Sequence, residues 1–297
     1  MKKTIFKATL IILPLLFLSG FLSPASAVDL PSINKSKIRF SLAPGKAEYG
    51  EIIVENQSSE PRSMRVYLSD WDYLPPADGT KEFLPISSTP LSCAAWISFS
   101  PAEFTLPPFS KQKVDYSVKV PTGASGGYYA ALFFESVFAK AQPVNEKEVM
   151  QAGMNLVIRI ATLFYVDVEG TVKRTALLDN LSFKKNTQSA GYSIGLDFRN
   201  TGNVDISAGG TFHIMDDQGM VVARGQLNDA HTFPAVGAKL TATLKDALAA
   251  GKYDLVFTLD LGKALEEANL GRGPIITKES QISIGENGKV LDIGQLR

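Results

Sequence analysis

Apolar side chains recur at every second position through most of this chain, and this spacing limits what the chain can fold into. In "KVDYSVKV" (113–120), valine and tyrosine alternate with lysine, aspartate and serine. The same pattern returns in "YSIGLDFRN" (192–200) and "KYDLVFTLD" (252–260). A period of two indicates β-strands with one buried and one wet face, which is typical of antiparallel sheets packed into sandwiches.

Turn sequences separate the predicted strands. Asparagine, aspartate and glycine gather in tight-turn combinations at "NTGN" (200–203), "DDQG" (216–219) and "ENGK" (286–289). Short strands divided in this way predict an all-β protein with two immunoglobulin-like β-sandwich domains, residues 28–170 and 171–297. Two segments are predicted to be helical instead, 145–152 and 262–271, and a glycine closes the second as in many helix C-caps.

Residues 1–27 have the features of a cleaved signal peptide. A lysine-rich start precedes a mostly apolar run from 5 to 21, and Ala25-Ser26-Ala27 fits a small-x-small cleavage site. We therefore expect an exported protein whose mature chain begins at Val28. The alternative is an uncleaved anchor, but the apolar run is short for a span. No later stretch is long and apolar enough to cross a membrane.

Charge and cysteine content exclude some classes of function. Loss of three leader lysines from 30 basic residues leaves a net charge of about −3 against 30 acidic residues. This balance argues against a nucleic-acid partner, which binds to a basic face. Cys93 is the only cysteine, so no intramolecular disulfide is possible. Its neighbours in "SCAAWISF" predict a small buried side chain rather than a reactive thiol.

The glycine-rich turn "TGASGG" (122–127) does not fit a catalytic loop. It lacks the Lys-Ser/Thr pair of a phosphate loop and the spacing of a nucleophile elbow, and a strand follows it. We expect it to reverse the chain with a glycine at positive φ. Of the two histidines, His213 is predicted to face solvent and His231 to lie in a loop, and neither has a second ligand at a suitable spacing. The sequence therefore predicts no enzyme, no metal and no cofactor.

The segment "SDWDYLPPADGT" (69–80) allows two other interpretations. Its three aspartates are candidate calcium ligands, but the spacing and terminal glutamate of an EF-hand are absent, so a turn-rich loop is favoured. Trp71 and Tyr73, together with Phe83, are candidates for a sugar-stacking platform in one predicted loop. Loop aromatics more often pack onto their own sandwich.

One predicted strand breaks the alternation. Residues 128–134, "YYAALFF", are apolar throughout, so both faces of this strand need cover. We expect the following loop, 137–152, or the second domain to cover the outer face; the alternative is a protein partner.

The succession of strands resembles the N-terminal domain of periplasmic pilus chaperones of the PapD type. The resemblance covers about residues 36–168 and rests on "GEIIVENQSSEPRSMRVYLSDW", "WISFSPAEFTLPPFSKQKVDYSVKVP", "GGYYAALFFES" and "NLVIRIATLFYV". Leu163-Phe164-Tyr165 match the Leu-Phe-Tyr ending of the family's last strand. The stretch "VPTGASGGYYAALFF" also resembles the WxL-interacting surface proteins of Gram-positive bacteria, which likewise have a second β-sandwich.

The resemblance implies binding by strand addition, in which the last strand lends main-chain hydrogen bonds and alternate bulky side chains to a partner. Side chains alternate between the two faces of this strand, and the row on either face is a candidate for the side chains lent to the partner. The implied partner-binding residues are Leu156, Ile158, Ile160, Leu163, Phe164 and Tyr165. The family also clamps the carboxyl terminus of its subunit with an arginine and a lysine. Thr162 stands at the lysine position, and Arg39 lies about one residue from the arginine position, so we expect this clamp to be missing.

With this resemblance, the sequence favours a non-enzymatic envelope protein of a bacterium, periplasmic or at the cell surface, that acts as a chaperone-like adaptor and binds another exported protein through a strand edge or apolar face. A surface adhesin or structural subunit is the second hypothesis. A carbohydrate-binding module or an unrecognised enzyme is the third.

Overall fold

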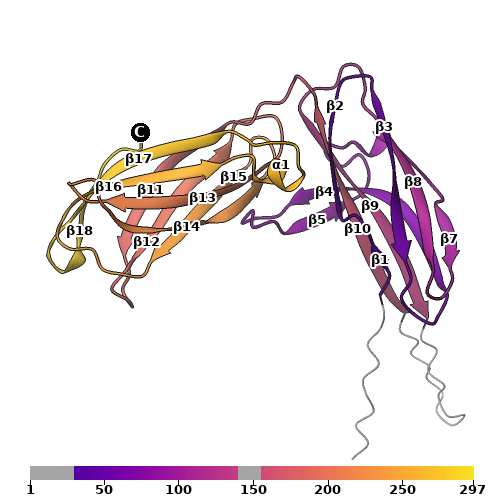
Figure 1. Ribbon diagram of the computed structural model, residues 1–297, viewed down its shortest axis with the longest axis horizontal. Helices are drawn as coiled ribbons and strands as arrows, with labels where there is room; N and C mark the ends of the chain where they lie inside the picture. The colour runs from indigo at the N-terminus through magenta and orange to yellow at the C-terminus, as the bar shows by residue number, and fades with distance from the viewer. Residues whose placement is uncertain (1–29, 140–154) are drawn as a thin grey trace, which may run out of the picture.

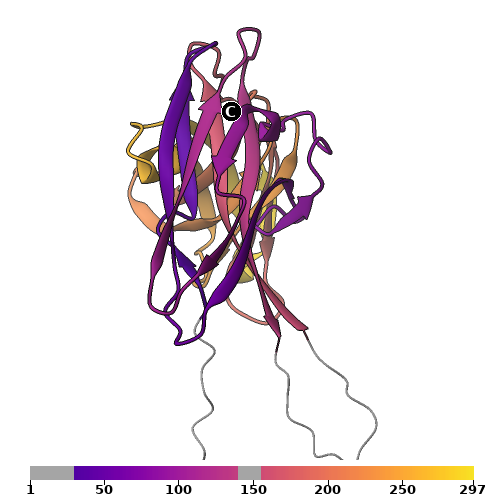
Figure 2. The ribbon, with the colours of Figure 1, turned by 90° about the vertical axis from the view of Figure 1, so that its right-hand side faces the viewer.

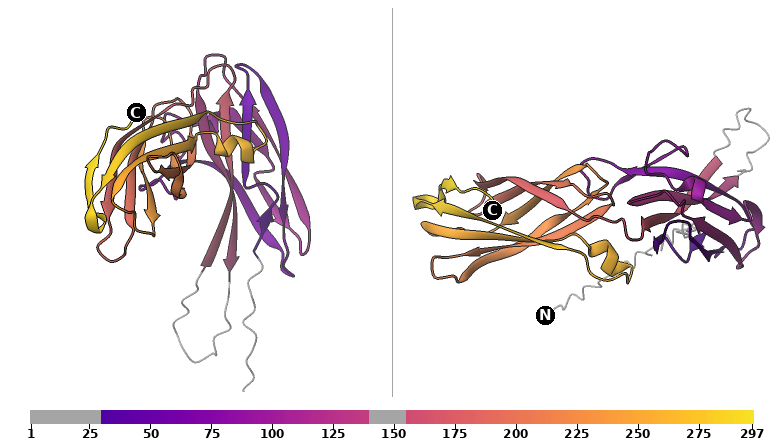
Figure 3. Two further views of the ribbon diagram at one scale, coloured as in Figure 1. Left: turned by 60° about the vertical axis from the view of Figure 1, so that its left-hand side comes forward. Right: turned by 90° about the horizontal axis from the view of Figure 1, so that it is seen from above.

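The computed structural model describes residues 30–139 and 155–297, and it confirms an all-β protein. Two β-sandwiches lie at an angle to each other, one built from strands before residue 169 and one from strands after residue 175 (Figure 1). In Figure 2 the first sandwich lies in front of the second, and Figure 3 shows the two bodies joined at one end. Within the described residues, no helix is both long and apolar enough for a membrane span.

The first sandwich packs a four-stranded sheet against a six-stranded one. The four-stranded sheet has the order β1 (Ser32–Ile33), β3 (Ala47–Glu55), β8 (Lys111–Lys119) and β6 (Ile97–Ser100), and the short 3-10 turn η1 (Ala94–Trp96) precedes β6. The six-stranded sheet has the order β2 (Lys37–Leu42), β10 (Asn155–Val168), β9 (Gly127–Ala139), β4 (Arg62–Tyr73) and β5 (Lys81–Leu84), with β7 (Glu103–Leu106) also paired to β4.

The predicted alternation builds the core of this sandwich. Along β8, Val114, Tyr116 and Val118 are buried, whereas the residues between them are exposed or half-buried. They pack against Leu132 of β9 and its row neighbours in the opposite sheet. Cys93 lies in the same core and is fully buried, as its apolar surroundings predict.

The second sandwich also has two sheets. The smaller sheet has the order β11 (Ala176–Lys185), β12 (Tyr192–Asn200) and β15 (Gly237–Leu244). The larger sheet has the order β14 (Val221–Thr232), β13 (Ile206–Met215), β16 (Gly251–Asp260), β17 (Ile275–Ile284) and β18 (Val290–Ile293). One α-helix, α1 (Lys263–Glu267), and one 3-10 turn, η2 (Glu286–Gly288), complete the described part of this sandwich.

Local predictions for the second half are confirmed where the structure describes them. The apolar row of β12 is buried, and the row of β16 is buried in the same core. The helix predicted at 262–271 is present, but only Lys263–Glu267 are α-helical. The "DDQG" turn closes with a hydrogen bond from Asp216 N–H to the Met220 carbonyl (3.0 Å). The other predicted helix, 145–152, lies outside the described residues.

The outer face of β9 is covered from two directions. Tyr129, Ala131 and Phe133 point to this face and are each 5% exposed or less. Trp71 of the first sandwich and Phe233 of the second pack on Tyr129, with ring centroids at 5.9 and 4.3 Å, whereas Tyr67 and Phe83 of the first sandwich pack on Phe133. The expectation that the second domain covers this face is therefore confirmed at the Tyr129 end, whereas most of the loop 137–152 lies outside the described residues.

The aromatic residues of 69–80 lie in strands, not in a loop, and this prediction was wrong. Trp71 and Tyr73 continue β4, and Phe83 lies on β5 opposite Trp71. The apolar positions shift from the even-numbered row of "SMRVYLS" to the odd-numbered Trp71 and Tyr73 in "DWDY", so the alternation changes phase within β4. Trp71 is 1% exposed, so this strand presents no indole ring for sugar stacking.

Candidate functional site

Strand β10 has one edge that is only partly paired. On one side it pairs with β9 along its length, from Asn155 to Asp167. On the other side it pairs in parallel with β2, but only from Leu163 to Val168. Among the described residues, no strand pairs with the second edge of β10 before Leu163. A segment of exposed strand edge therefore remains, and we call residues 155–162 the free edge.

The hydrogen bonds to β2 identify which backbone groups point to the free edge. Leu163 N–H donates to the Ser36 carbonyl and Glu169 N–H to the Leu42 carbonyl, each at 2.9 Å. Because the backbone groups of a strand alternate between its two sides, odd-numbered residues of β10 point away from β9. The N–H and C=O groups of residues 157, 159 and 161 therefore point outward along the free edge.

The predicted partner-binding residues divide between the two faces of β10. Ile160 and Phe164 pack on the core between the sheets, and Ile158 shares their row, whereas Leu163 and Tyr165 pack on the aromatic cluster of the outer face. Phe164 is fully buried and Tyr165 is 2% exposed, so both are enclosed by the chain itself. Ile158, Ile160 and Leu163 are half-buried. The backbone of Leu156 pairs with Phe138, and its side chain lies outside the described residues.

The family's carboxylate clamp has no free counterpart at its two positions. Thr162 is fully buried, and its hydroxyl donates to the Lys35 carbonyl at 2.6 Å. The Arg39 side chain is 1% exposed, and its guanidinium donates to Asp205. Neither side chain is available to a partner's carboxyl terminus.

Arg39 belongs instead to an ion cluster buried between the sandwiches. Its Nη2 lies 2.6 Å from Oδ2 of Asp205 in the second sandwich, and its Nη1 lies 3.4 Å from Asp167 of β10. Arg174 adds a second cation, with Nη2 at 2.7 Å from Asp167 Oδ2. Burial raises the pKa of Asp167, and the nearby Arg39 guanidinium opposes that rise. Burial lowers the pKa of Arg39, but its interactions with Asp205, Asp167 and Tyr129 together outweigh burial, so the pKa is raised.

An aromatic cluster lies beside these ions. The ring of Phe233 lies 4.3 Å from Tyr129, 4.9 Å from Tyr73 and 5.0 Å from Trp71, measured between centroids. These rings come from β9, β4 and the segment after β14, so one side chain of the second sandwich completes the outer face of the first. Phe233 is 5% exposed, which makes it a buried anchor of the junction.

The glycine-rich turn also lies at the junction. Gly126 has φ +84°, as the predicted reversal requires. A Cβ on Gly126 would lie 2.6 Å from the Asn203 carbonyl, and the same carbonyl accepts a hydrogen bond from Gly127 N–H at 2.9 Å. The glycines therefore bend the chain and let the second sandwich approach closely.

Asp70, one of the candidate calcium ligands, has hydrogen-bond partners within the protein, and both histidines lie on strands. Asp70 is fully buried and accepts hydrogen bonds from Ser88 N–H (2.8 Å), Thr89 N–H (3.1 Å) and the Ser92 hydroxyl (2.5 Å). In the part of the chain that is described, no group of three His, Cys, Asp or Glu side chains is placed to hold a metal ion. His213 is half-buried in β13 rather than fully exposed, and His231 lies at the end of β14, not in a loop as predicted.

Comparison with known proteins gives matches only at the level of structure. No protein-family model matches the chain, and neither does any curated protein. Its structural neighbours are PapD-like fimbrial chaperones. A structure of the chaperone–tip adhesin complex of CFA/I fimbriae matches at 12% identity and a TM-score of 0.45, covering 84% of this chain and 98% of that chain. The class 5 fimbriae chaperone CfaA matches over the same shares at 12% identity and a TM-score of 0.44.

A third neighbour is the Salmonella enterica SafA pilin in complex with the SafB chaperone. It matches at 11% identity and a TM-score of 0.39, covering 85% of this chain and 97% of that chain. At such identities and scores, all three likenesses are likenesses of fold. The function is therefore argued below from the free edge itself.

Proposed function

We propose that the mature chain is a non-enzymatic exported protein of the bacterial envelope, a chaperone-like adaptor that binds another exported protein by strand addition. The free edge of β10 carries this proposal. Natural sheets pair, cover or charge their edges, because an open row of N–H and C=O groups recruits other strands. Here β2, which begins at Lys37, pairs only with Leu163–Val168 of this edge, and the rest lies open among the described residues.

The free edge offers two kinds of contact to an extended segment. The backbone groups of residues 157, 159 and 161 supply a ladder of hydrogen bonds that does not depend on the partner's sequence. The half-buried side chains of Ile158 and Ile160 supply an apolar row that fixes the register. In this proposal the partner also contacts Leu156. Leu163, Phe164 and Tyr165 pack within the chain and do not contact the partner.

The two other functions have no comparable support. A sugar-stacking platform needs an exposed ring, and Trp71 is 1% exposed. An adhesin needs a receptor surface, and no feature of the second sandwich indicates its ligand.

A backbone substitution tests strand addition without disturbing the core. In Arg159→Pro, the N–H of residue 159 is lost from the free edge, where proline is tolerated because none of the described strands pairs there. Arg159→Ala is the matched control, because it removes the same side chain and keeps the N–H. Crosslinking and pull-down from the native envelope should recover a partner with wild-type protein and Arg159→Ala, and lose it with Arg159→Pro. Equal recovery with both variants, each folded by circular dichroism, would contradict the proposal.

A further inference from the structure

Strand β4 changes partner halfway along its length. Its residues Met64–Ser69 pair with β9, whereas Asp70–Tyr73 pair with β5. Beyond Ser69, β4 therefore pairs with β5 and no longer with β9, and forms a two-stranded hairpin at the edge of the sheet, residues 70–84, which we call the arm. The arm extends from the first sandwich toward β14 of the second (Figure 1).

The tip of the arm contacts the end of β14 through His231. The N–H of His231 donates to the Ala77 carbonyl at 2.8 Å, a backbone hydrogen bond between the two sandwiches. The His231 ring lies 5.7 Å from the Tyr73 ring, measured between centroids. A Cβ on Gly79 would lie 3.1 Å from the same imidazole, so the arm approaches it closely. His231 is thus the residue of β14 that contacts the arm, through its backbone N–H and through its ring.

The imidazole is half-buried, and its Nδ1 lies 2.9 Å from the Ser207 hydroxyl. The charged groups that influence His231 come from several elements: Lys81 of β5, Asp78 of the arm, Lys37 of β2, Asp229 of β14 and Lys263 of α1. Two of these lysines have carboxylate neighbours, since Lys263 pairs with Asp229 and Lys37 lies 3.8 Å from Glu267. Lys81 instead donates to the Gly79 carbonyl at 2.7 Å.

These surroundings disfavour a positive charge on the imidazole. Burial lowers the pKa of His231, and the positive charge of Lys81 lowers it further, while Asp229 opposes both. A proton bound to His231 therefore costs free energy only while the arm is docked, and release of the arm restores hydration of the ring.

We propose that the arm is a pH-sensitive latch between the sandwiches: neutral His231 holds it against β14, and protonation of His231 on acidification loosens it. Histidine is the side chain whose charge changes in the mildly acidic range. The direction follows from the lowered pKa. Stabilisation from docking is complete above the ordinary histidine pKa of 6.5 and is lost as the pH falls below that value toward the folded-state pKa.

Tryptophan fluorescence can report the position of the arm. The chain has two tryptophans, and Trp71 lies in the aromatic cluster beside Phe233. In the full mature chain carrying Trp96→Phe, Trp71 is the single reporter. Titration from pH 8 to about pH 5 should move its emission to longer wavelength with a midpoint below the ordinary histidine pKa, while far-ultraviolet circular dichroism stays constant. Hydrogen exchange at the His231 amide, corrected for its intrinsic rate, should accelerate over the same range.

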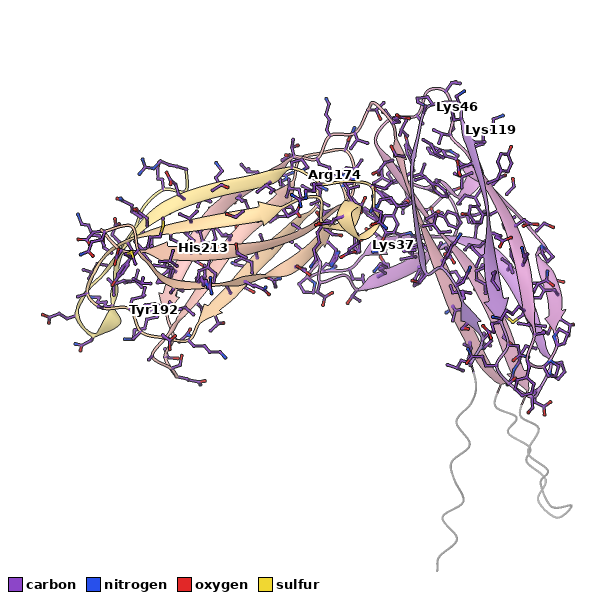
Figure 4. All side chains as sticks on the ribbon, in the orientation of Figure 1. Lys37, Lys46, Lys119, Arg174, Tyr192 and His213 are labelled. Carbon is purple, nitrogen blue, oxygen red and sulfur yellow. The ribbon has the colours of Figure 1, made fainter. Side chains whose placement is uncertain are left out.

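The second histidine provides the matched control. His213 lies on the second sandwich away from the junction (Figure 4). His213→Asn should keep the transition, whereas His231→Asn, which retains a polar side chain for Ser207, should abolish it. A transition that persists in His231→Asn would overturn the proposal. So would a wild-type emission that stays constant across the whole range.

Discussion

Nη2 of Arg39 lies 2.6 Å from Oδ2 of Asp205, and each side chain is 1% exposed. The pair joins β2 of the first sandwich to the second sandwich, across 166 positions of sequence. A buried pair of this kind stabilises little compared with an apolar pair of the same volume, but loss of one partner leaves an uncompensated charge. At the junction, each of these two charged side chains therefore depends on the other sandwich for its ion-pair partner.

Removal of the Arg39 charge should destabilise the protein strongly. In Arg39→Met, two buried carboxylates, Asp167 and Asp205, lose their shared cation, and we expect a loss of about 3–5 kcal/mol in the free energy of unfolding. Urea denaturation measures it. Lys113→Met is the control, because Lys113 pairs with Glu51 at 2.7 Å but is 65% exposed, so solvent screens the pair and its loss should change the stability far less. Similar losses for the two variants would contradict this account.

Phe233→Ala should uncouple the two sandwiches. The truncation empties the space between Trp71, Tyr73 and Tyr129 and should cost about 3–5 kcal/mol. Because most of this cost falls on the junction, differential scanning calorimetry should resolve two transitions in the variant where the wild type gives one. Val236→Ala, at a side chain 39% exposed, should leave the profile unchanged. A single transition in Phe233→Ala at the wild-type temperature would show that the ring does not couple the sandwiches.

Two glycines of the same turn should respond differently to alanine. Gly126 has φ +84° and would place a Cβ 2.6 Å from the Asn203 carbonyl, so Gly126→Ala should cost more than about 1 kcal/mol from the backbone alone. Gly123 has no atom within 4 Å of such a Cβ, and Gly123→Ala should stay within about 0.5 kcal/mol. Thermal or urea denaturation of both variants measures the contrast, and equal stabilities would argue against the close approach.

Lys81→Met should raise the pKa of His231. The substitution removes a positive charge that lowers this pKa in the docked arm and keeps a side chain of similar length. Nuclear magnetic resonance titration of the two imidazoles gives both values at once, and His213 serves as an internal reference. Lys46→Met is the control, because Lys46 lies at the end of the first sandwich away from β14 (Figure 4). An unchanged or lower His231 pKa in Lys81→Met would contradict the electrostatic account.

The period of two was sufficient to predict strands in which it is unbroken, such as β8, β12 and β16, because it reports local burial. It was not sufficient for the junction, since Arg39 and Asp205 meet only after both sandwiches fold. One local signal existed: Asp167 in "YVDV" lies within β10 and Asp205 in "NVDI" directly precedes β13, and both carboxylates are flanked by apolar residues. A charge in that setting indicates a buried partner.

The free edge was predictable only in part. The chain order placed the last strand of the first sandwich beside "GGYYAALFFES", and β10 does pair with β9. The sequence did not indicate which row of β10 faces the core, because both rows are apolar and alternation is the only local criterion. The place where β2 stops covering β10 follows from the path of residues 34–36 between the two sheets, which no pattern in those residues indicates.

The outer face of β9 determines how this protein can be divided. A chain cut near Gly170 would expose Trp71 and Tyr129 to water and leave Arg39 without Asp205. The first sandwich is therefore unsuitable as a stand-alone module for fusion or domain exchange, even though it contains the whole described free edge. Any swap that preserves binding has to carry both sandwiches, and the two halves are expected to be inherited together.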